Sequence, residues 1–210
     1  MRITNLGHAS FLIEGEEVSF VIDPYEDNSV PCLTLPRVKA NFAFKSHDHS
    51  DHNALDLVEI IPSKATLDYR TIIVPHDKNG GEMRGLNKIH IFDIDGYEII
   101  HMGDTGCIPS DAVLEELKNA DVLLGPINGF FTISSEELRD ICEVIKPRLV
   151  IPMHYYKKED NSGYPDGNQI DTFKFLYPNA LEVNDYSIEL SDELLNKGAL
   201  IFRFALQEEL

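Results

Sequence analysis

The chain has 210 residues, of which 43% are hydrophobic, and its 36 acidic and 18 basic residues give a net charge of −18. This length fits one domain, residues 1–210, and the apolar content is enough to bury a core without disulfide or metal staples. Nucleic acids and anionic membranes bind proteins mainly through lysine and arginine contacts with phosphates. The acidic balance therefore excludes both as expected partners.

The N-terminus and the cysteines favour a cytoplasmic protein. Met1-Arg2 leads directly into a mixed segment that carries Glu14 and Glu16, so no signal peptide is expected. No apolar stretch approaches the ~20 residues that cross a bilayer. The cysteines are odd in number and widely spaced, namely Cys32, Cys107 and Cys142. We interpret them as buried small hydrophobic residues in a reducing compartment, not as a disulfide framework.

The first part of the chain predicts short strands followed by a loop. The expected strands are Ile3–Asn5, Ser10–Glu14 and Val18–Asp23, which are β-branched or aromatic runs separated by turns. Residues 25–39 are rich in proline and polar side chains and predict a long surface loop. Another short apolar run, Asn41–Lys45, precedes a histidine cluster. Asn53–Glu59 predicts a short helix with Asn53 as its N-cap.

The rest of the chain alternates strands and helices. Strands are expected over Thr66–Val74, Leu86–Ile94, Tyr97–His101, Arg148–Pro152 and Ala199–Phe204, and helices over Ser110–Asn119, Ser135–Ile145 and Gln169–Leu176. Asp95-Gly96 signals a two-residue hairpin, and Ser134 with Glu137 forms a capping box. Tight turns favour antiparallel pairing, so we expect a mixed α/β domain with two packed sheets and not a doubly wound parallel sheet.

The segment His47-Asp48-His49-Ser50-Asp51-His52 carries the strongest chemical signal. His47 and His49 are two residues apart on an ending strand, so both imidazoles point to one side and can reach one cation. After a turn, Asp51 and His52 can offer a carboxylate and an imidazole to a second cation. These ligands suit zinc, manganese and iron, and the lack of thiolates argues against a closed structural zinc site.

Six residues do not complete two metal sites, so further ligands are expected at other strand ends. His76 follows the apolar run 72–75, and His154 follows the run 149–153. Asp104 lies between Gly103 and Gly106, glycines that let the backbone approach a bound ion. Its carboxylate has two oxygens and can bridge two cations. His76, Asp104 and His154 are therefore candidate ligands.

These motifs resemble those of the metallo-β-lactamase-fold hydrolases, and within them the branch similar to ascorbate-6-phosphate lactonase. The resemblance covers most of the chain, through residues 7–10, 23–24, 46–52, 76–77, 101–106 and 151–155. It implies an α/β (α+β) four-layer αββα sandwich with the site at one edge between the sheets. By resemblance, one metal is held by His47, His49 and His76, and the other by Asp51, His52 and His154. Asp104 would bridge the two.

Other residues are expected beside the metals. Asp23 matches an aspartate of the family that orients the histidine loop by hydrogen bonds, and a merely strand-ending role is the alternative. His8 and His101 match positions close to the site, where ligand support or substrate contact is weighed against core packing. Tyr155 directly follows a proposed ligand and is a candidate for substrate contact. His90 lies in an alternating strand and is expected outside the site.

The predicted activity is hydrolysis of a small ester-like substrate, namely a lactone, phosphodiester or thioester. Two divalent cations, most simply zinc, with manganese or iron as alternatives, can lower the pKa of a shared water from 15.7 to about 7. The attacking group would be the metal-bound hydroxide. Asp51 is the candidate catalytic residue, because its carboxylate can orient that hydroxide or take a proton.

Two other functions stay open at this point. An iron-dependent oxidoreductase could use the same ligands, but the chain has no glycine-rich flavin-binding segment or second domain to deliver electrons. A non-catalytic metal-binding protein could keep the fold without turnover, and the presence of every expected ligand argues against it. The loops Tyr25–Lys39 and Tyr155–Gly167 are expected to form the pocket walls, whose shape residue types do not define. Assembly into a homo-oligomer is compatible with the sequence.

Overall fold

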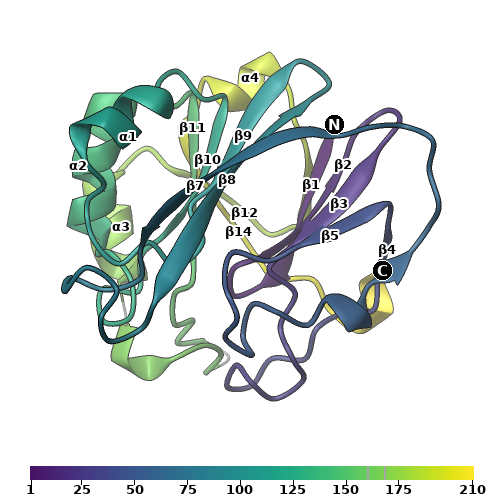
Figure 1. The fold of residues 1–210 in the computed structure, drawn as a ribbon, viewed down its shortest axis with the longest axis horizontal. Helices are drawn as coiled ribbons and strands as arrows, with labels where there is room; N and C mark the ends of the chain where they lie inside the picture. The colour runs from purple at the N-terminus through teal and green to yellow at the C-terminus, as the bar shows by residue number, and fades with distance from the viewer. Residues whose placement is uncertain (160, 168) are drawn as a thin grey trace.

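Two β-sheets packed face to face dominate the computed structural model of the chain, which describes residues 1–159, 161–167 and 169–210 (Figure 1). The first sheet has the strand order β13 (Ser187–Glu189), β1 (Arg2–Gly7), β2 (Ser10–Glu14), β3 (Ser19–Ile22), β5 (Phe42–Phe44). The second has the order β12 (Leu181–Val183), β14 (Gly198–Phe202), β11 (Leu149–Met153), β10 (Val122–Pro126), β9 (Tyr97–His101), β8 (Leu86–Ile94), β7 (Asp68–Pro75). A separate two-stranded pair joins β4 (Lys39–Ala40) to β6 (Glu59–Ile60).

Both large sheets mix parallel and antiparallel pairing. Antiparallel pairing holds for β13-β1-β2-β3 and for β7-β8-β9, as the tight turns predict. Parallel pairing holds for β3 with β5 and for β9, β10, β11, β14 and β12, which no tight turn joins. The reason is that α1 (Asp111–Glu116) and α2 (Ser135–Ile145) connect β9 to β10 and β10 to β11. Such crossovers return the chain in the same direction.

The buried apolar residues form three layers. Phe11, Phe20 and Phe92 belong to the cluster between the two sheets, where the rings of Phe20 and Phe92 stack at 4.1 Å. A second cluster joins the other face of the seven-stranded sheet to the helices, with Leu138 as a representative. A third lies on the outer face of the five-stranded sheet and includes Val21. Alternate strand residues thus feed different layers, because successive side chains point to opposite faces of a sheet.

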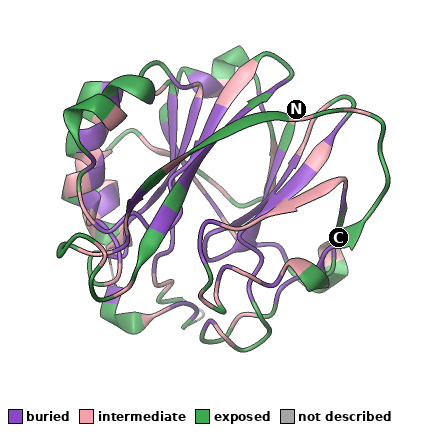
Figure 2. Cartoon of the chain, in the orientation of Figure 1, coloured by how far each residue is buried: buried purple, intermediate pink, exposed green. Residues whose placement is uncertain are grey.

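The outer layers agree with a sandwich whose two sheets are covered from outside. The helices α1, α2 and α3 (Ile170–Leu176) lie along the outer face of the seven-stranded sheet (Figure 1). On the outer face of the five-stranded sheet, residues 24–40 and 54–58 form most of the cover, with one turn of 3₁₀ helix at Leu55–Leu57. Figure 2 shows the buried strands between these more exposed layers. The remaining helix, α4 (Asp192–Leu195), adds Leu195 to the cluster between the sheets.

Most predicted elements are confirmed, and one helix is wrong. The 135–145 helix forms with its capping box, and the 95–96 hairpin turn has positive φ at both residues. The predicted helix Asn53–Glu59 is only a 3₁₀ turn, because the Asn53 amide donates to the Asp48 carbonyl and does not cap a helix. Glu59 then pairs with Lys39 in an extended conformation. Strand β10 is not among the predicted strands, because its five residues are all buried and therefore lack alternation.

Two further features bear on the sequence predictions. Within the described part of the chain, no helix is long and apolar enough to span a membrane.

The three cysteines form no disulfide, but the prediction that they are buried is wrong: Cys32 is exposed, and Cys107 and Cys142 are only half-buried.

Replacing Phe92 by alanine tests the layer between the sheets. The ring is fully buried and stacks on Phe20, so its loss should lower the free energy of unfolding by about 3–5 kcal/mol. Urea denaturation followed by circular dichroism measures this loss. The matched control is Phe175→Ala, whose ring is 81% exposed and whose loss should cost little. Equal losses for the two variants would contradict the assigned core.

Candidate metal centre

Each predicted metal ligand, together with His8 and Asp23, follows the C-terminal end of a strand. In the first sheet, β1, β3 and β5 run in one direction and end just before His8, Asp23 and the 47–52 segment. In the second, β7, β9 and β11 also share a direction, and they end just before His76, Asp104 and His154. The His154 N–H donates to the His8 carbonyl at 2.9 Å and so joins the two edges. Parallel strand ends thus gather side chains that are far apart in the sequence.

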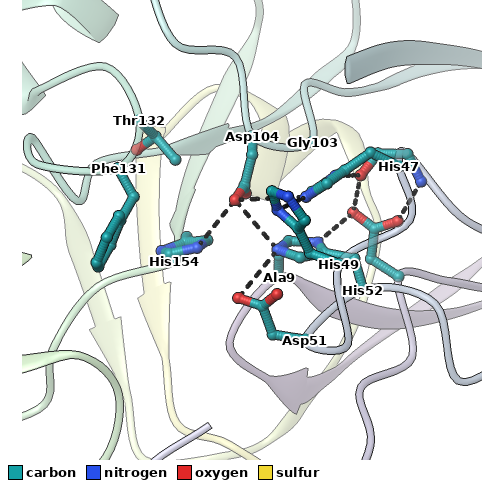
Figure 3. Close-up of polar contacts among 12 residues, drawn as sticks. Ala9, His47, His49, Asp51, His52, Gly103, Asp104, Phe131, Thr132 and His154 are labelled. Carbon is teal, nitrogen blue, oxygen red and sulfur yellow. Dashed lines mark hydrogen bonds and ion pairs between the residues drawn. The ribbon is translucent and has the colours of Figure 1, made fainter. Parts of the chain in front are cut away.

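The Asp104 carboxylate lies at the centre of four imidazoles. Its Oδ2 is 3.2 Å from Nε2 of both His52 and His154, 3.4 Å from that of His76 and 4.0 Å from that of His47. Figure 3 shows the carboxylate pointing into this cluster from the strand end above it. All of these side chains are buried except for a few per cent of their surface.

The seven predicted ligands fall into two groups around Asp104. His47, His49 and His76 form one group, with potential ligand atoms within 4.8 Å of one another. Asp51, His52 and His154 form the other, joined by His8. Asp104 itself groups with one histidine from each side, His47 and His52. The structure therefore brings together all seven residues, in the division that the sequence resemblance implies.

Two glycines allow Asp104 to reach this position. A Cβ atom on Gly106 would lie 2.2 Å from the backbone nitrogen of Asp77, on the loop that carries His76. A Cβ on Gly103 would lie 2.2 Å from Oδ1 of Asn87. That amide oxygen instead accepts a hydrogen bond from the Asp104 N–H at 2.9 Å. Glycine at both positions therefore lets three backbone segments meet around the carboxylate.

Asp23 holds the histidine loop in place from below. Its carboxylate accepts hydrogen bonds from the Ser46 backbone at 2.5 Å and hydroxyl at 2.6 Å, and it pairs with His52 Nδ1 at 2.8 Å. The Ser46 hydroxyl also lies 2.9 Å from His47 Nδ1. These contacts leave Nε2 of both histidines facing Asp104. Asp23 therefore fixes the orientation of the imidazole rings and is not itself a candidate ligand.

Burial and charge set the protonation of these side chains. Burial lowers the pKa of His47 to about 3 and that of His8 to about 4, so both are neutral at pH 7. Burial also lowers the pKa of His76. His52 is the exception: burial acts to lower its pKa, but the surrounding carboxylates, Asp104 foremost, raise it well above 6.5. Burial would raise the pKa of Asp104, yet His154 and His52 hold it well below its usual range.

Unpaired buried atoms indicate that the cluster is built for a cation. Several buried atoms of the cluster have no hydrogen-bond partner among the described residues. They are Nε2 of His52, both ring nitrogens of His76, Nδ1 of His154 and Oδ1 of Asp104. Buried polar atoms are nearly always paired in native proteins, so a group of orphans calls for a bound species. Imidazole nitrogens and carboxylate oxygens are what zinc, manganese and iron accept. The residues therefore fit a metal centre.

The remaining predicted residues divide between support and core. His101 donates from Nε2 to the Ala9 carbonyl at 2.8 Å and accepts from the Gly103 N–H at 3.1 Å, so it fixes the backbone beside Asp104. Tyr155 is placed differently from the prediction: its ring packs in the helix-side cluster near Phe204 and does not line the pocket. It directly follows His154, but β11 ends at Met153 and the backbone turns at His154 with a positive φ of 54°, so adjacency in sequence does not place both side chains in the cleft. His90 lies outside the site, as expected, near the Lys45 carbonyl.

A cleft of about 410 Å³ opens onto the cluster and contains residues that the sequence did not indicate. Its lining is Asp48, His49, Ser50, Asp51, Arg84, Asp104, Phe131, His154 and Tyr164. The Tyr164 hydroxyl lies 2.8 Å from the Ser29 carbonyl and 3.3 Å from Asp51 Oδ2. His8 Nε2 also lies 3.3 Å from that oxygen. Tyr164, not Tyr155, is therefore the tyrosine of this pocket, from the loop expected to form its wall.

Replacing Asp23 by asparagine should weaken metal binding without removing a ligand. An amide keeps the shape but presents an N–H₂ group where the carboxylate accepts from Ser46 and His52. Metal affinity should fall about 10- to 100-fold, as is usual for such supporting residues. Competition with a chromogenic chelator measures it, with Asp68→Asn on exposed β7 as control. Unchanged affinity would place Asp23 outside the metal centre.

The raised pKa of His52 predicts that metal binding releases a proton at pH 7. The group is protonated in the metal-free protein and must lose its proton to become a ligand. Affinity should therefore strengthen as pH rises from 6 to 8. In the metal-free protein the sign is opposite: stability from charged His52 is full below about pH 6.5 and is lost as pH rises through the raised pKa. Calorimetric titration in buffers of different ionisation enthalpy counts the protons, and no release would contradict the assignment.

Comparison with known proteins places this geometry in a family. A sequence model described as the β-lactamase superfamily domain matches residues 2–154, which include all seven clustered candidate residues. A UPF0173 metal-dependent hydrolase of Thermococcus kodakarensis is 31% identical, and the alignment covers 87% of this chain and 95% of that protein. Another, of Carboxydothermus hydrogenoformans, is 28% identical over 74% of this chain and 84% of its own length.

A solved structure agrees with the sequence relatives. A Thermotoga maritima protein assigned as a Zn-dependent hydrolase of the metallo-β-lactamase superfamily superposes with a TM-score of 0.76 at 25% identity. The superposition covers 97% of this chain and 99% of that one. The predicted fold is thus confirmed. The chain belongs to the UPF0173 family and is a metal-dependent hydrolase of the metallo-β-lactamase superfamily.

Proposed function

We propose that the protein hydrolyses a small ester-like substrate, a lactone, phosphodiester or thioester, at a centre of two divalent cations. The observation that carries the proposal is the position of Asp104, whose Oδ2 lies within 4.0 Å of histidine nitrogens from both ligand groups. A carboxylate shared by two sets of ligands suits a pair of cations better than one. The lactone class also follows from the resemblance to ascorbate-6-phosphate lactonase.

In this proposal the residues hold the two cations as two sets. His47, His49 and His76 are the ligands of one, and Asp51, His52 and His154 are those of the other, with Asp104 shared. When bound, the pair supplies a hydroxide nucleophile at neutral pH and polarises the oxygen of the scissile group. Zinc is the first candidate, supported by the name of the Thermotoga maritima relative, and manganese and iron use similar ligands.

Asp51 is the proposed catalytic residue. Its Oδ2 faces the cleft within 3.3 Å of both His8 Nε2 and the Tyr164 hydroxyl. His52 contributes most to lowering the pKa of this carboxylate against the effect of burial, so Asp51 is ionised at neutral pH. An ionised carboxylate only accepts hydrogen bonds and can therefore orient an attacking water or take its proton. His8 and Tyr164 would fix the direction in which the carboxylate points.

The setting of the reaction is also a proposal. The net charge of −18 and the narrow cleft favour a small molecule over nucleic acid or a membrane as the partner. The reduced cysteines are consistent with a cytoplasmic location. Hydrolysis is favoured over iron-dependent oxidation because the matched relatives are named hydrolases. No observation favours a non-catalytic role or defines a homo-oligomer.

Metal loading and mutation test this proposal together. Wild type, His49→Ala and Asp104→Asn are loaded with Zn²⁺, Mn²⁺ or Fe²⁺ and assayed against panels of lactones, phosphodiesters and thioesters. Wild type should bind two ions per chain and hydrolyse at least one class, and each variant should lose bound metal and at least ~100-fold of the rate, because it lacks a ligand. Asp93→Asn, on the exposed side of β8, is the control. A fully loaded wild type that hydrolyses no class would contradict the proposal.

A further inference from the structure

One arginine of the chain differs from all the others in its surroundings. Six arginines form ion pairs with carboxylates, namely Arg2, Arg37, Arg70, Arg139, Arg148 and Arg203. The seventh, Arg84, has no carboxylate partner in the part of the chain that the structure describes, although acidic residues outnumber basic ones two to one. Among the residues that the structure describes, it is also the only arginine or lysine that lines the cleft at the metal centre.

The fold holds Arg84 in this position. The loop that follows His76 is organised by Asp77, whose carboxylate accepts hydrogen bonds from four backbone N–H groups, including that of Arg84 at 2.8 Å. The guanidinium lies over the ring of Phe131, 4.2 Å from its centroid. Such a cation–π contact fixes the direction of the side chain while leaving its N–H donors free. Arg84 is thus preorganised and unpaired.

Phe131 joins the guanidinium to the catalytic side of the cleft. Its backbone N–H donates to Asn128 Oδ1 at 2.8 Å, which fixes the loop. Its ring makes an edge contact with Tyr164 at 5.4 Å, and the Tyr164 hydroxyl lies 3.3 Å from Asp51. Figure 3 shows the Phe131 ring beside His154, on the opposite side of the cluster from His47. One wall of the cleft therefore runs from Arg84 through two aromatic rings to the metal centre.

We propose that Arg84 binds an anionic oxygen group of the substrate, a carboxylate or a phosphate, at a distance from the bond that is hydrolysed. The inference rests on the proposed function and names its substrate class: small ester-like molecules that carry a second, negatively charged group. An arginine guanidinium can pair with a carboxylate or with a phosphate through two parallel hydrogen bonds. Bound cations would offset the carboxylates of the centre, so an anion meets a favourable field in spite of the acidic chain.

Matched substrate pairs test the role of Arg84. Each pair shares one lactone or thioester core and differs only in a distal group, which is a carboxylate, a phosphate monoester or a neutral methyl ester. Metal-loaded wild type should prefer a charged member, and Arg84→Gln should lower kcat/KM for that member about 10- to 100-fold, mainly through KM. Arg84→Lys should recover part of the loss, since it keeps charge but not the fork. The better of the two charged members identifies the group.

Two comparisons separate recognition from structural damage. Hydrolysis of the neutral member should change less than about twofold in Arg84→Gln, because its core makes no contact with the guanidinium. Arg70→Gln, an exposed arginine of β7, is the control for charge removal and should retain the preference. Equal losses for charged and neutral members, or no preference in wild type, would overturn the assignment of Arg84.

A binding measurement distinguishes failure of this inference from failure of the proposed function. Phenylacetate and phenyl phosphate are titrated into metal-loaded wild type and Arg84→Gln by calorimetry. At least one should bind about 10-fold more weakly to the variant, whether or not turnover is seen. If Arg84→Gln binds a probe more weakly than wild type but no substrate is hydrolysed, the hydrolase proposal is overturned and the role of Arg84 stands. Equal binding of both probes to the two proteins overturns the role of Arg84.

Discussion

The structure depends on one electrostatic constraint, the gathering of three carboxylates in a single cluster, where Asp23 and Asp104 are buried and Asp51 is half-buried. Asp23, Asp51 and Asp104 stay ionised because neighbouring histidines lower their pKa values against the effect of burial. His8 and His47 are neutral at pH 7 and offset none of that charge, and His52 offsets only part of it. Ionised groups without compensation are costly to bury. A bound metal ion would supply positive charge at this cluster, so metal binding should be coupled to the stability of this region.

The sandwich meets this constraint by using strand ends from both sheets. Parallel crossovers through α1 and α2 bring the ends of β9, β10 and β11 to one edge, and β1, β3 and β5 end opposite them. One residue of the cluster follows each of β1, β3, β7, β9 and β11, and the segment after β5 contributes four, His47, His49, Asp51 and His52. The apolar layers can therefore remain continuous up to the edge, where the polar cluster begins. The catalytic chemistry is confined to loops on a rigid frame.

The polar cluster was predictable because its signals are local. His47 and His49 lie in bends after β5 and not on the strand that was predicted there, but their spacing still puts them in one group with His76. His76, Asp104 and His154 each follow a recognisable apolar run. The predicted division into two ligand groups matches the grouping in the structure. Strand β10 could not be predicted in this way, because both of its faces are buried and an all-apolar strand has no period-two pattern.

Features that depend on loop geometry were not predictable. Tyr155 is adjacent to a ligand in sequence, but its side chain points to the helix layer, and Tyr164 reaches the pocket from further along the loop. The contact of Arg84 with Phe131 joins segments that follow two different strands, and no local pattern encodes it. These same residues shape the cleft. The residues of the candidate metal centre could thus be predicted from the sequence, whereas the residues that shape the substrate cleft are brought together only by tertiary contacts.

The central claim, a pair of cations around Asp104, is tested most directly by anomalous X-ray diffraction from crystals grown with Zn²⁺ or Mn²⁺. Data collected on both sides of the metal absorption edge locate each ion independently of any assay. If two cations bind around Asp104, two anomalous peaks should lie about 3.5–4 Å apart, one within coordination distance of each ligand group and both next to the Asp104 carboxylate. A single peak, or peaks away from this carboxylate, would contradict it.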